Sequence, residues 1–267
     1  MRRRPELGRW PQRERPQLPD VPGRLVAGLQ PVREAITAHG RAVHRVSVEH
    51  GDNPRLEALV RFATDHGVAE VTREPRLLLD ALTEGTVHQG VVAWAPTLEL
   101  LDFAELLADP ALLGIVLDGI SDPQNFGAVV RSAVGIAGAA VIWGEHASAP
   151  LSLATFRASA GAVEHARLCR VPSLTAAITE AVASGAQVVG LDAQADRALH
   201  ELDLTGPTLL VLGSEGEGMS RSVRRSLSAT ARLAQSGRIG SLNASVAAAI
   251  ALYEASNQRV KTKTSAP

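Results

Sequence analysis

The sequence is poor in cysteine, in lysine and in long apolar segments. Cys169 is the only cysteine among 267 residues, which excludes a disulfide framework and a cysteine-based metal site and is typical of a reducing cytoplasm. The histidines are scattered without the spacing of metal ligands, so we expect no metal site. No apolar run approaches the ~20 residues that a helix needs to span a bilayer. We therefore expect a cytoplasmic protein with no membrane segment.

The chain also lacks a net charge of either sign, since its formal charge at pH 7 is −1. Any contact with nucleic acid must then come from local patches. Only two of the 27 basic residues are lysines, Lys261 and Lys263; codon bias in a GC-rich genome explains this, although guanidinium groups also suit phosphate contacts. Residues 1–23, rich in Arg and Pro, are predicted to be a flexible basic arm, either a solvated tail or an RNA contact. We expect residues 261–267 to be a disordered tail.

Two α/β units are predicted between these ends. In the first, residues 24–96, we expect helices at 31–39, 54–66 and 76–82, with Asn53 as the cap of the second, and strands at 43–48, 68–71 and 89–94. Residues 97–110 are predicted to be a linker with one helix at 100–107. In the second unit, 111–260, apolar strands are expected at 112–117, 139–143, 166–171, 187–191 and 208–212. Apolar strands that alternate with helical stretches predict a mostly parallel sheet covered on both faces.

The segment 112–133 carries polar residues next to a predicted buried strand. A polar loop, 118–125, follows the strand, and we expect Gly127 to open a helix that carries Arg131. Asp122 in a turn and Asn125 as a helix cap would explain the loop structurally. They do not explain an arginine on an otherwise apolar helix. Side chains at the end of such a strand lie where ligands usually bind in α/β sheets.

Two later segments resist a purely structural account. In 209–220 a buried strand enters a glycine-rich turn that holds Glu215 and Glu217. Its glycine spacing fits neither a dinucleotide fingerprint nor a P-loop, so a nicotinamide oxidoreductase is the weakest alternative. In 240–253, Ser241 or Asn243 can cap a helix made mostly of Ala and Val.

The three segments together, in this order and at this spacing, resemble the SpoU/TrmH family of RNA ribose 2′-O-methyltransferases. The matching residues are Asp118, Asp122, Pro123, Asn125, Gly127, Arg131 and Ser132 in the first motif, Gly213, Glu215, Gly216 and Gly218 in the second, and Ser241, Leu242, Asn243, Ser245, Val246 and Ala247 in the third. The first unit is similar to the L30e-like substrate-binding domain of the rRNA-methylating branch, at residues 28–32 and 88–91. The resemblance covers about residues 24–258.

The resemblance implies a SPOUT-like fold: a C-terminal, mostly parallel sheet domain with a trefoil knot that forms the S-adenosylmethionine pocket. It also implies a homodimer with sites near the interface. The implied cofactor contacts are Gly213, Leu233 and Leu242, and the implied catalytic residues are Asn125, Arg131, Glu215, Ser241 and Asn243. The chain departs from the family at 233–235, where Leu-Ala-Gln replaces the usual Ile-Pro-Met step. The loss of a proline removes a fixed φ and puts cofactor affinity in doubt.

The implied reaction is methyl transfer to a ribose 2′-hydroxyl, most like the branch that modifies a guanosine of 23S rRNA, with rRNA or an assembling large subunit as partner. The same reaction on another rRNA or tRNA nucleotide, as in thiostrepton-resistance enzymes, stays open, as does a non-catalytic RNA-binding homologue. The family's proposed base is Arg131, yet a guanidinium group has almost no neutral form at neutral pH and is therefore a poor base. We expect Arg131 to grip the RNA phosphate, Glu215 to orient Asn125 or Arg131, and Asn125, Ser241 and Asn243 to fix the ribose.

Overall fold

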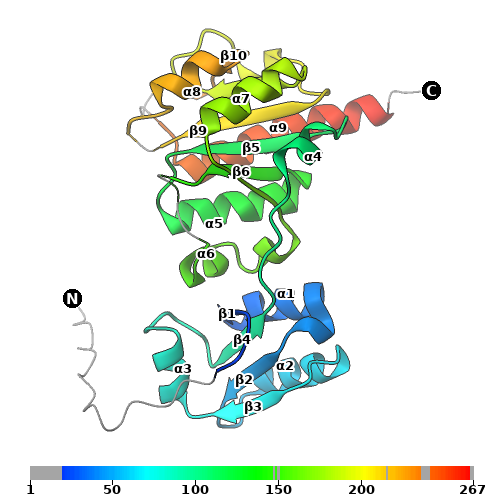
Figure 1. Cartoon of the computed structure of the whole chain (residues 1–267), viewed down its shortest axis with the longest axis vertical. Coiled ribbons are helices and arrows are strands. Elements are labelled where there is room, and N and C mark those ends of the chain that lie inside the picture. The colour runs from blue at the N-terminus through cyan, green and yellow to red at the C-terminus, as the bar shows by residue number, and fades with distance from the viewer. Residues whose placement is uncertain (1–19, 147, 149–150, 215, 236–240, 265–267) are drawn as a thin grey trace.

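The protein is described by a computed structural model that covers residues 20–146, 148, 151–214, 216–235 and 241–264. Figure 1 shows two α/β domains that follow each other along the long axis, the N-terminal one below and the C-terminal one above. Within the described residues, no helix is long and apolar enough to cross a membrane. Most of the expected arm, residues 1–19, lies outside the described part.

The N-terminal domain is a four-stranded sheet with three α-helices. Its elements are β1 (Arg24–Ala27), α1 (Leu29–His39), β2 (Arg45–Glu49), α2 (Pro54–Asp65), β3 (Val71–Glu74), α3 (Arg76–Leu82) and β4 (Val91–Ala95). The strand order is β1-β4-β2-β3, and only the β2–β3 pair is parallel. The predicted cap is confirmed, since the side chain of Asn53 accepts a hydrogen bond from the amide of Arg55 at 3.0 Å.

Two strands of this domain differ from the prediction. The strand expected at 68–71 begins only at Val71, because the amide of Val68 still donates to the carbonyl of Ala63 and closes the end of α2. The strand β1 was not predicted. Its four residues are too few to show a hydrophobic alternation, and it forms by antiparallel pairing with β4.

The C-terminal domain is built on a six-stranded sheet in the order β10-β8-β9-β5-β6-β7. The strands are β5 (Leu113–Asp118), β6 (Ala140–Gly144), β7 (Arg167–Val171), β8 (Gln187–Leu191), β9 (Thr208–Gly213) and β10 (Ala229–Ala231). Every pair in this sheet is parallel, which confirms the predicted mostly parallel sheet. The short strand β10 was not predicted.

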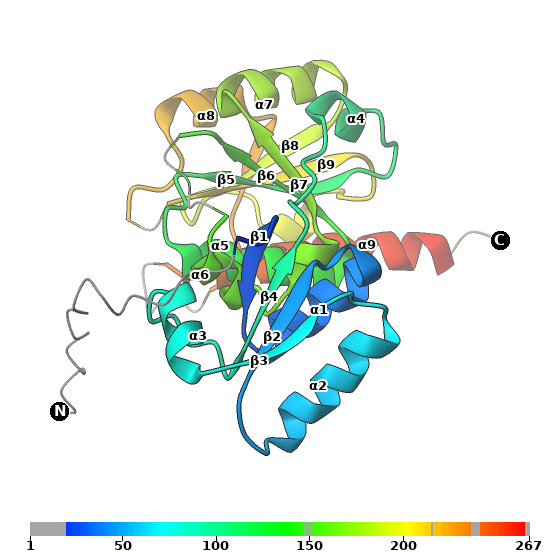
Figure 2. The same ribbon diagram turned by 60° about the horizontal axis from the view of Figure 1, so that its bottom comes forward.

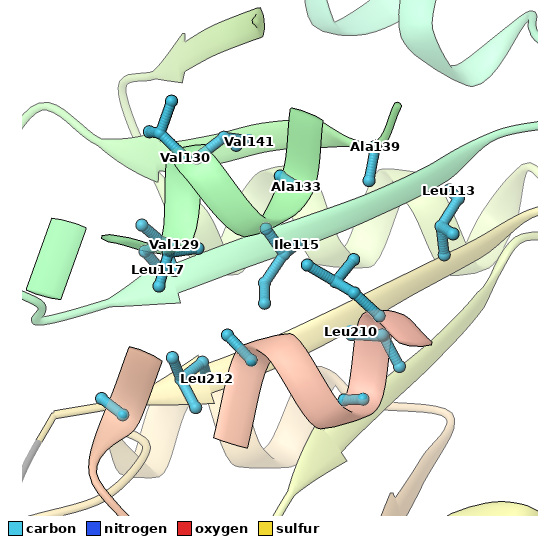
Figure 3. Packing of buried hydrophobic residues seen from close by; sticks show 14 of the residues in the cluster. Leu113, Ile115, Leu117, Val129, Val130, Ala133, Ala139, Val141, Leu210 and Leu212 are labelled. Carbon is cyan, nitrogen blue, oxygen red and sulfur yellow. The ribbon is translucent and has the colours of Figure 1, made fainter. Parts of the chain in front are cut away.

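Helices cover both faces of this sheet. The helices α5 (Pro123–Ser132) and α9 (Ala244–Thr264) pack on one face, against alternating residues such as Ile115 and Leu212 (Figure 3). The other face, which includes Val116, packs against α4 (Phe103–Leu107), α7 (Leu174–Ala183) and α8 (Arg221–Ser226). The buried Leu106 of α4 belongs to this core, so the helix in the predicted linker packs on the C-terminal domain.

The predicted start of the helix in the first motif was wrong, and so was the structural alternative for Asn125. The helix α5 begins at Pro123, and its cap is Asp122, whose side chain accepts hydrogen bonds from the amides of Gln124 and Asn125. Asn125 therefore does not have the capping role that the purely structural alternative gave it. Gly127 lies inside the helix, where a Cβ would come within 2.6 Å of the carbonyl oxygen of Thr155. Its absence of a side chain lets α5 approach α6 (Leu153–Ala158) closely.

The helix α9 continues to Thr264 and so includes the first four residues of the expected disordered tail. No proline or glycine interrupts the helix from Ala244 onward, so its backbone hydrogen bonds continue past the last core contact. The resemblance implies that the last segment threads through a loop, and residues 236–240, which precede this segment, lie outside the described part. The knot stays a prediction.

A buried ionic cluster joins the two domains. The carboxylate of Glu164, in the turn after α6, pairs with the guanidinium of Arg24 and lies 2.9 Å from Nε2 of His39. Its side chain is fully buried. A second contact, between Glu34 of α1 and His165, is also 2.9 Å long. In Figure 1 and Figure 2, β1 lies next to α6 of the C-terminal domain at this junction.

Candidate active site

Three neighbouring strands of the C-terminal sheet end together at one edge. Asp118, the last residue of β5, lies opposite Gly213, the last residue of β9. Because Gly190 of β8 lies opposite Val211, Asp192 leaves the sheet beside Gly213. Ligands bind at this edge in open α/β sheets, and the first two motifs therefore meet there.

The glycine-rich turn of the second motif folds back closely on its own strand. Ser214 and Gly218 exchange two backbone hydrogen bonds, of 3.1 and 3.0 Å. A Cβ on Gly213 would lie 2.2 Å from backbone atoms of Gly218 and Met219, so only glycine fits. The carboxylate of Asp118 accepts a hydrogen bond from the amide of Ser220 at 2.6 Å. This bond ties the end of β5 to the turn.

The first and third motifs meet through two side-chain amides. The Nδ2 group of Asn243 donates to Oδ1 of Asn125 at 2.9 Å, across 118 positions of sequence. The Oδ1 atom of Asn243 also accepts from the amides of Ser245 and Val246, which makes it the cap of α9. The predicted cap is thereby confirmed for Asn243, and one side chain both starts the helix and holds the other motif.

A cavity of about 620 Å³ opens at this edge of the sheet, within the usual size of small-molecule sites. It is lined by Leu191, Asp192, Ala193, Leu212, Gly213, Ser214, Gly216, Gly218, Met219, Arg224, Leu233, Gln235, Ser241, Leu242, Asn243, Ala244 and Ala247. The three residues predicted to contact a cofactor, Gly213, Leu233 and Leu242, are all among them. The altered step at 233–235 contributes both Leu233 and Gln235 to the wall.

The remaining predicted residues lie at different places. Ser241 and Asn243 line the cavity, whereas Asn125 and Arg131 do not. Arg131 is exposed on α5, less than two helical turns from Asn125. Glu215 lies outside the described residues. Within the described part, no three His, Cys, Asp or Glu side chains are grouped closely enough to hold a metal ion.

The two charged residues of the described cavity wall were missed by the sequence analysis. Asp192 follows β8, and its carboxylate forms an ion pair with Arg224 of α8. A hydrogen bond from the amide of Gln194, together with the Arg224 guanidinium, lowers the pKa of Asp192 below its usual value. An acid directly after a buried strand was the signal that could have indicated it.

The cavity suits S-adenosylmethionine. Leucines at positions 191, 212, 233 and 242 provide apolar surface for an adenine ring, and the turn beginning at Gly213 lets backbone approach a ligand closely. The ion pair of Asp192 and Arg224 and the polar side chains of Ser241 and Asn243 offer hydrogen-bonding groups in the same wall. Apolar walls with a few placed polar groups are typical of cofactor sites.

Comparison with known proteins identifies both domains. Residues 112–253 match the model of the SpoU rRNA Methylase family, and residues 25–100 match the model described as RNA 2′-O ribose methyltransferase substrate binding. A protein of Mycolicibacterium smegmatis, described as an uncharacterised tRNA/rRNA methyltransferase, is 39% identical over 88% of this chain and 76% of its own length.

Two solved structures share the fold and were determined with the methyl donor. The SpoU methyltransferase AviRb from Streptomyces viridochromogenes, in complex with AdoMet, has a TM-score of 0.70 and 27% identity over 89% of this chain and 90% of its own. An AdoMet-bound rRNA methyltransferase from Sinorhizobium meliloti has a TM-score of 0.69 and 26% identity, covering 86% of this chain and 85% of its own. The chain belongs to the SpoU rRNA methylase family of methyltransferases.

Proposed function

We propose that this protein transfers a methyl group from S-adenosylmethionine to the 2′-hydroxyl of a ribose in RNA, and that the target is a guanosine of 23S rRNA. The observation that carries the proposal is the hydrogen bond between Asn125 and Asn243, which joins the first and third motifs beside the cavity. The substrate-binding match over 25–100 supports ribose as the acceptor. The guanosine rests on resemblance to the branch that has this domain.

The residues around the cavity have the chemistry that such a transfer requires. When bound, S-adenosylmethionine supplies an electrophilic methyl group, so the protein needs to align the hydroxyl and remove its proton. The amides of Asn125 and Asn243 and the hydroxyl of Ser241 offer hydrogen bonds that fix a ribose. Glu215, in the predicted scheme, orients Asn125 or Arg131.

Arg131 acts in this scheme as a cation and not as a base. A guanidinium group is protonated at all physiological pH values, and Arg131 is exposed on the helix that carries Asn125. It can therefore hold an RNA phosphate in a bidentate manner. Its charge also stabilises the negative oxygen that develops as the hydroxyl loses its proton.

In this proposal the two domains have different functions, RNA binding and methyl transfer. Residues 24–96 form the RNA-binding unit and residues 111–260 the knotted catalytic unit, with the linker 97–110 between them. The cluster of Glu164, Arg24 and His39 fixes one unit on the other. The partner that we propose for the first unit is rRNA in an assembling large subunit, in the cytoplasm.

We further propose a homodimer formed through α9. This helix exposes a row of large apolar side chains, with Val246, Ile250, Tyr253 and Val260 between 43% and 63% exposed. Their spacing places them on one side of the helix, and an exposed apolar patch of this kind marks an interaction site. Light scattering of the wild type and of Tyr253→Arg tests this: we expect a dimer for the first and a monomer for the second.

An in vitro transfer assay tests the reaction. The protein is incubated with radiolabelled S-adenosylmethionine and large-subunit RNA that lacks ribose methylation, and the RNA is digested to nucleosides. We expect label in 2′-O-methylguanosine. Label in 2′-O-methyladenosine would move the target to the thiostrepton-resistance type. Label in a methylated base would overturn the ribose proposal, and cofactor binding without transfer to any RNA would indicate a non-catalytic RNA-binding protein.

A further inference from the structure

Two residues of the described cavity wall carry a charge. Among the described residues that line it, Asp192 and Arg224 alone carry a charge. Asp192 leaves the sheet at the end of β8, and Arg224 lies in the last turn of α8. They pair with each other, so in the described part of the wall each charge is compensated by the other. Neither belongs to the three sequence motifs.

Asp192 is held firmly in one orientation. Its backbone amide donates to the carbonyl of Ala231 at 3.0 Å, and its Oδ1 atom accepts from the amide of Gln194 at 3.0 Å. Arg224 binds the other oxygen, Oδ2. The side chain is 15% exposed. Since each carboxylate oxygen can accept two hydrogen bonds, each retains one acceptor position after these contacts.

We propose that Asp192 accepts hydrogen bonds from the two ribose hydroxyls of S-adenosylmethionine, with Arg224 as the positioning residue that fixes the carboxylate. This proposal rests on the proposed function, because it requires the cofactor in this cavity. The cis-diol of a ribose offers two neutral O–H donors, which match the two remaining acceptor positions. Carboxylates bind ribose hydroxyls in the same way in dinucleotide sites of other α/β folds.

The cationic donor of the cofactor is a poorer match. Its methionine part carries an ammonium group, and a carboxylate with no counter-ion would attract it. Arg224 already neutralises Asp192, and its own charge would repel a second cation placed beside the pair. Hydroxyl groups meet no such repulsion. The ion pair therefore favours the ribose over the amino-acid end.

Binding measurements on matched variants test the assignment. We expect Asp192→Asn to bind S-adenosylhomocysteine about tenfold or more weakly by calorimetry, because a charged hydrogen bond is lost. Arg224→Ala should weaken binding less, and Arg224→Lys should restore most of it. The controls are Asp196→Asn, in the same loop, and Arg225→Ala, next to Arg224. Both residues are exposed and absent from the cavity wall, so their variants should bind as the wild type does.

Three ligands separate the possible roles of Asp192. S-adenosylhomocysteine contains the adenine, the ribose diol and the amino acid, 5′-methylthioadenosine lacks the amino acid, and 5′-methylthio-2′,3′-dideoxyadenosine also lacks the diol. We expect Asp192→Asn to lose the same factor for the first two and nothing for the third. A loss confined to S-adenosylhomocysteine, or an equal loss for all three, would overturn the assignment. Failure of the wild type to bind S-adenosylhomocysteine would instead overturn the proposed function. If Asp192→Asn does not fold, Arg224→Ala is measured with the same three ligands.

Discussion

The side chain of Asn243 joins two segments of the candidate active site, donating a hydrogen bond to Oδ1 of Asn125 at 2.9 Å while its own oxygen caps α9. The two asparagines therefore have different structural roles. Asn125 lies in the candidate site and does not cap its helix, because Asp122 does. Asn243 lies in the candidate site and also caps the helix that follows.

This difference predicts different behaviour for two alanine variants. Asn125→Ala should lower kcat about tenfold or more, as for the loss of one group that positions the reacting hydroxyl, with little change in Tm. Asn243→Ala should lower kcat similarly and also cost about 1 kcal/mol of stability through the lost cap. Methyl transfer and thermal unfolding of both proteins check this. Equal stability of the two variants would contradict the capping role.

Variants of Arg131 test whether RNA binding and methyl transfer require a planar cation at this position. Arg131→Ala should lower kcat/KM for RNA by about tenfold or more, and Arg131→Lys should recover only part of it, because an ammonium group cannot form two parallel hydrogen bonds to a phosphate. Neither variant should alter Tm, since the side chain is exposed. Arg170→Ala, exposed on β7, is the control. Near-full activity of Arg131→Lys would contradict the bidentate role.

A variant of Glu164 tests whether the ionic cluster between the two domains contributes to stability and to RNA binding. Glu164→Gln leaves Arg24, whose side chain is 12% exposed, without its ion-pair partner, and such a loss costs about 3 kcal/mol. We expect a lower Tm and a raised KM for RNA, with the Kd for S-adenosylhomocysteine unchanged because the cavity lies elsewhere. Glu180→Gln, exposed on α7, should change none of these. An unchanged KM for RNA would show that domain docking does not position the substrate.

We expect the buried thiol of Cys169 to make the free energy of unfolding decrease at alkaline pH. Burial raises the pKa of its thiol from 9.0 to about 11, so the folded protein holds this proton more tightly than the unfolded chain. The resulting stabilisation is fully present below pH 9 and is lost as the pH rises through about 11. Urea unfolding of wild type and Cys169→Ala between pH 8 and pH 11 checks this, and the variant should show the shallower decline. Parallel declines would contradict it.

Much of the catalytic domain could be predicted from sequence. Apolar runs such as 187–191 and 208–212 are buried on both faces, and that burial leaves a continuous hydrophobic signal. Capping also has a local signal, and Asn53 and Asn243 both cap as expected. At the start of α5 the sequence offers two possible capping residues, Asp122 and Asn125. The backbone geometry of the helix start makes Asp122 the cap, and the sequence alone does not indicate this.

Contacts between distant segments leave no such signal. Nothing in the spacing of Asn125 and Asn243 indicates that they touch, and only the family resemblance brought them together. Asp192 and Arg224 lie 32 positions apart on elements that look ordinary, and their pairing follows from the order of the strands. The four residues of β1 form a strand because β4 offers an edge, which no local pattern encodes.

The most direct test of the central claim is a map of ribose 2′-O-methylation across all ribosomal RNA from cells with and without the gene. We predict that one methylated guanosine of 23S rRNA is lost in the deletion strain. It should return with the wild-type gene and not with Asn125→Ala. An identical methylation map in both strains would contradict the account.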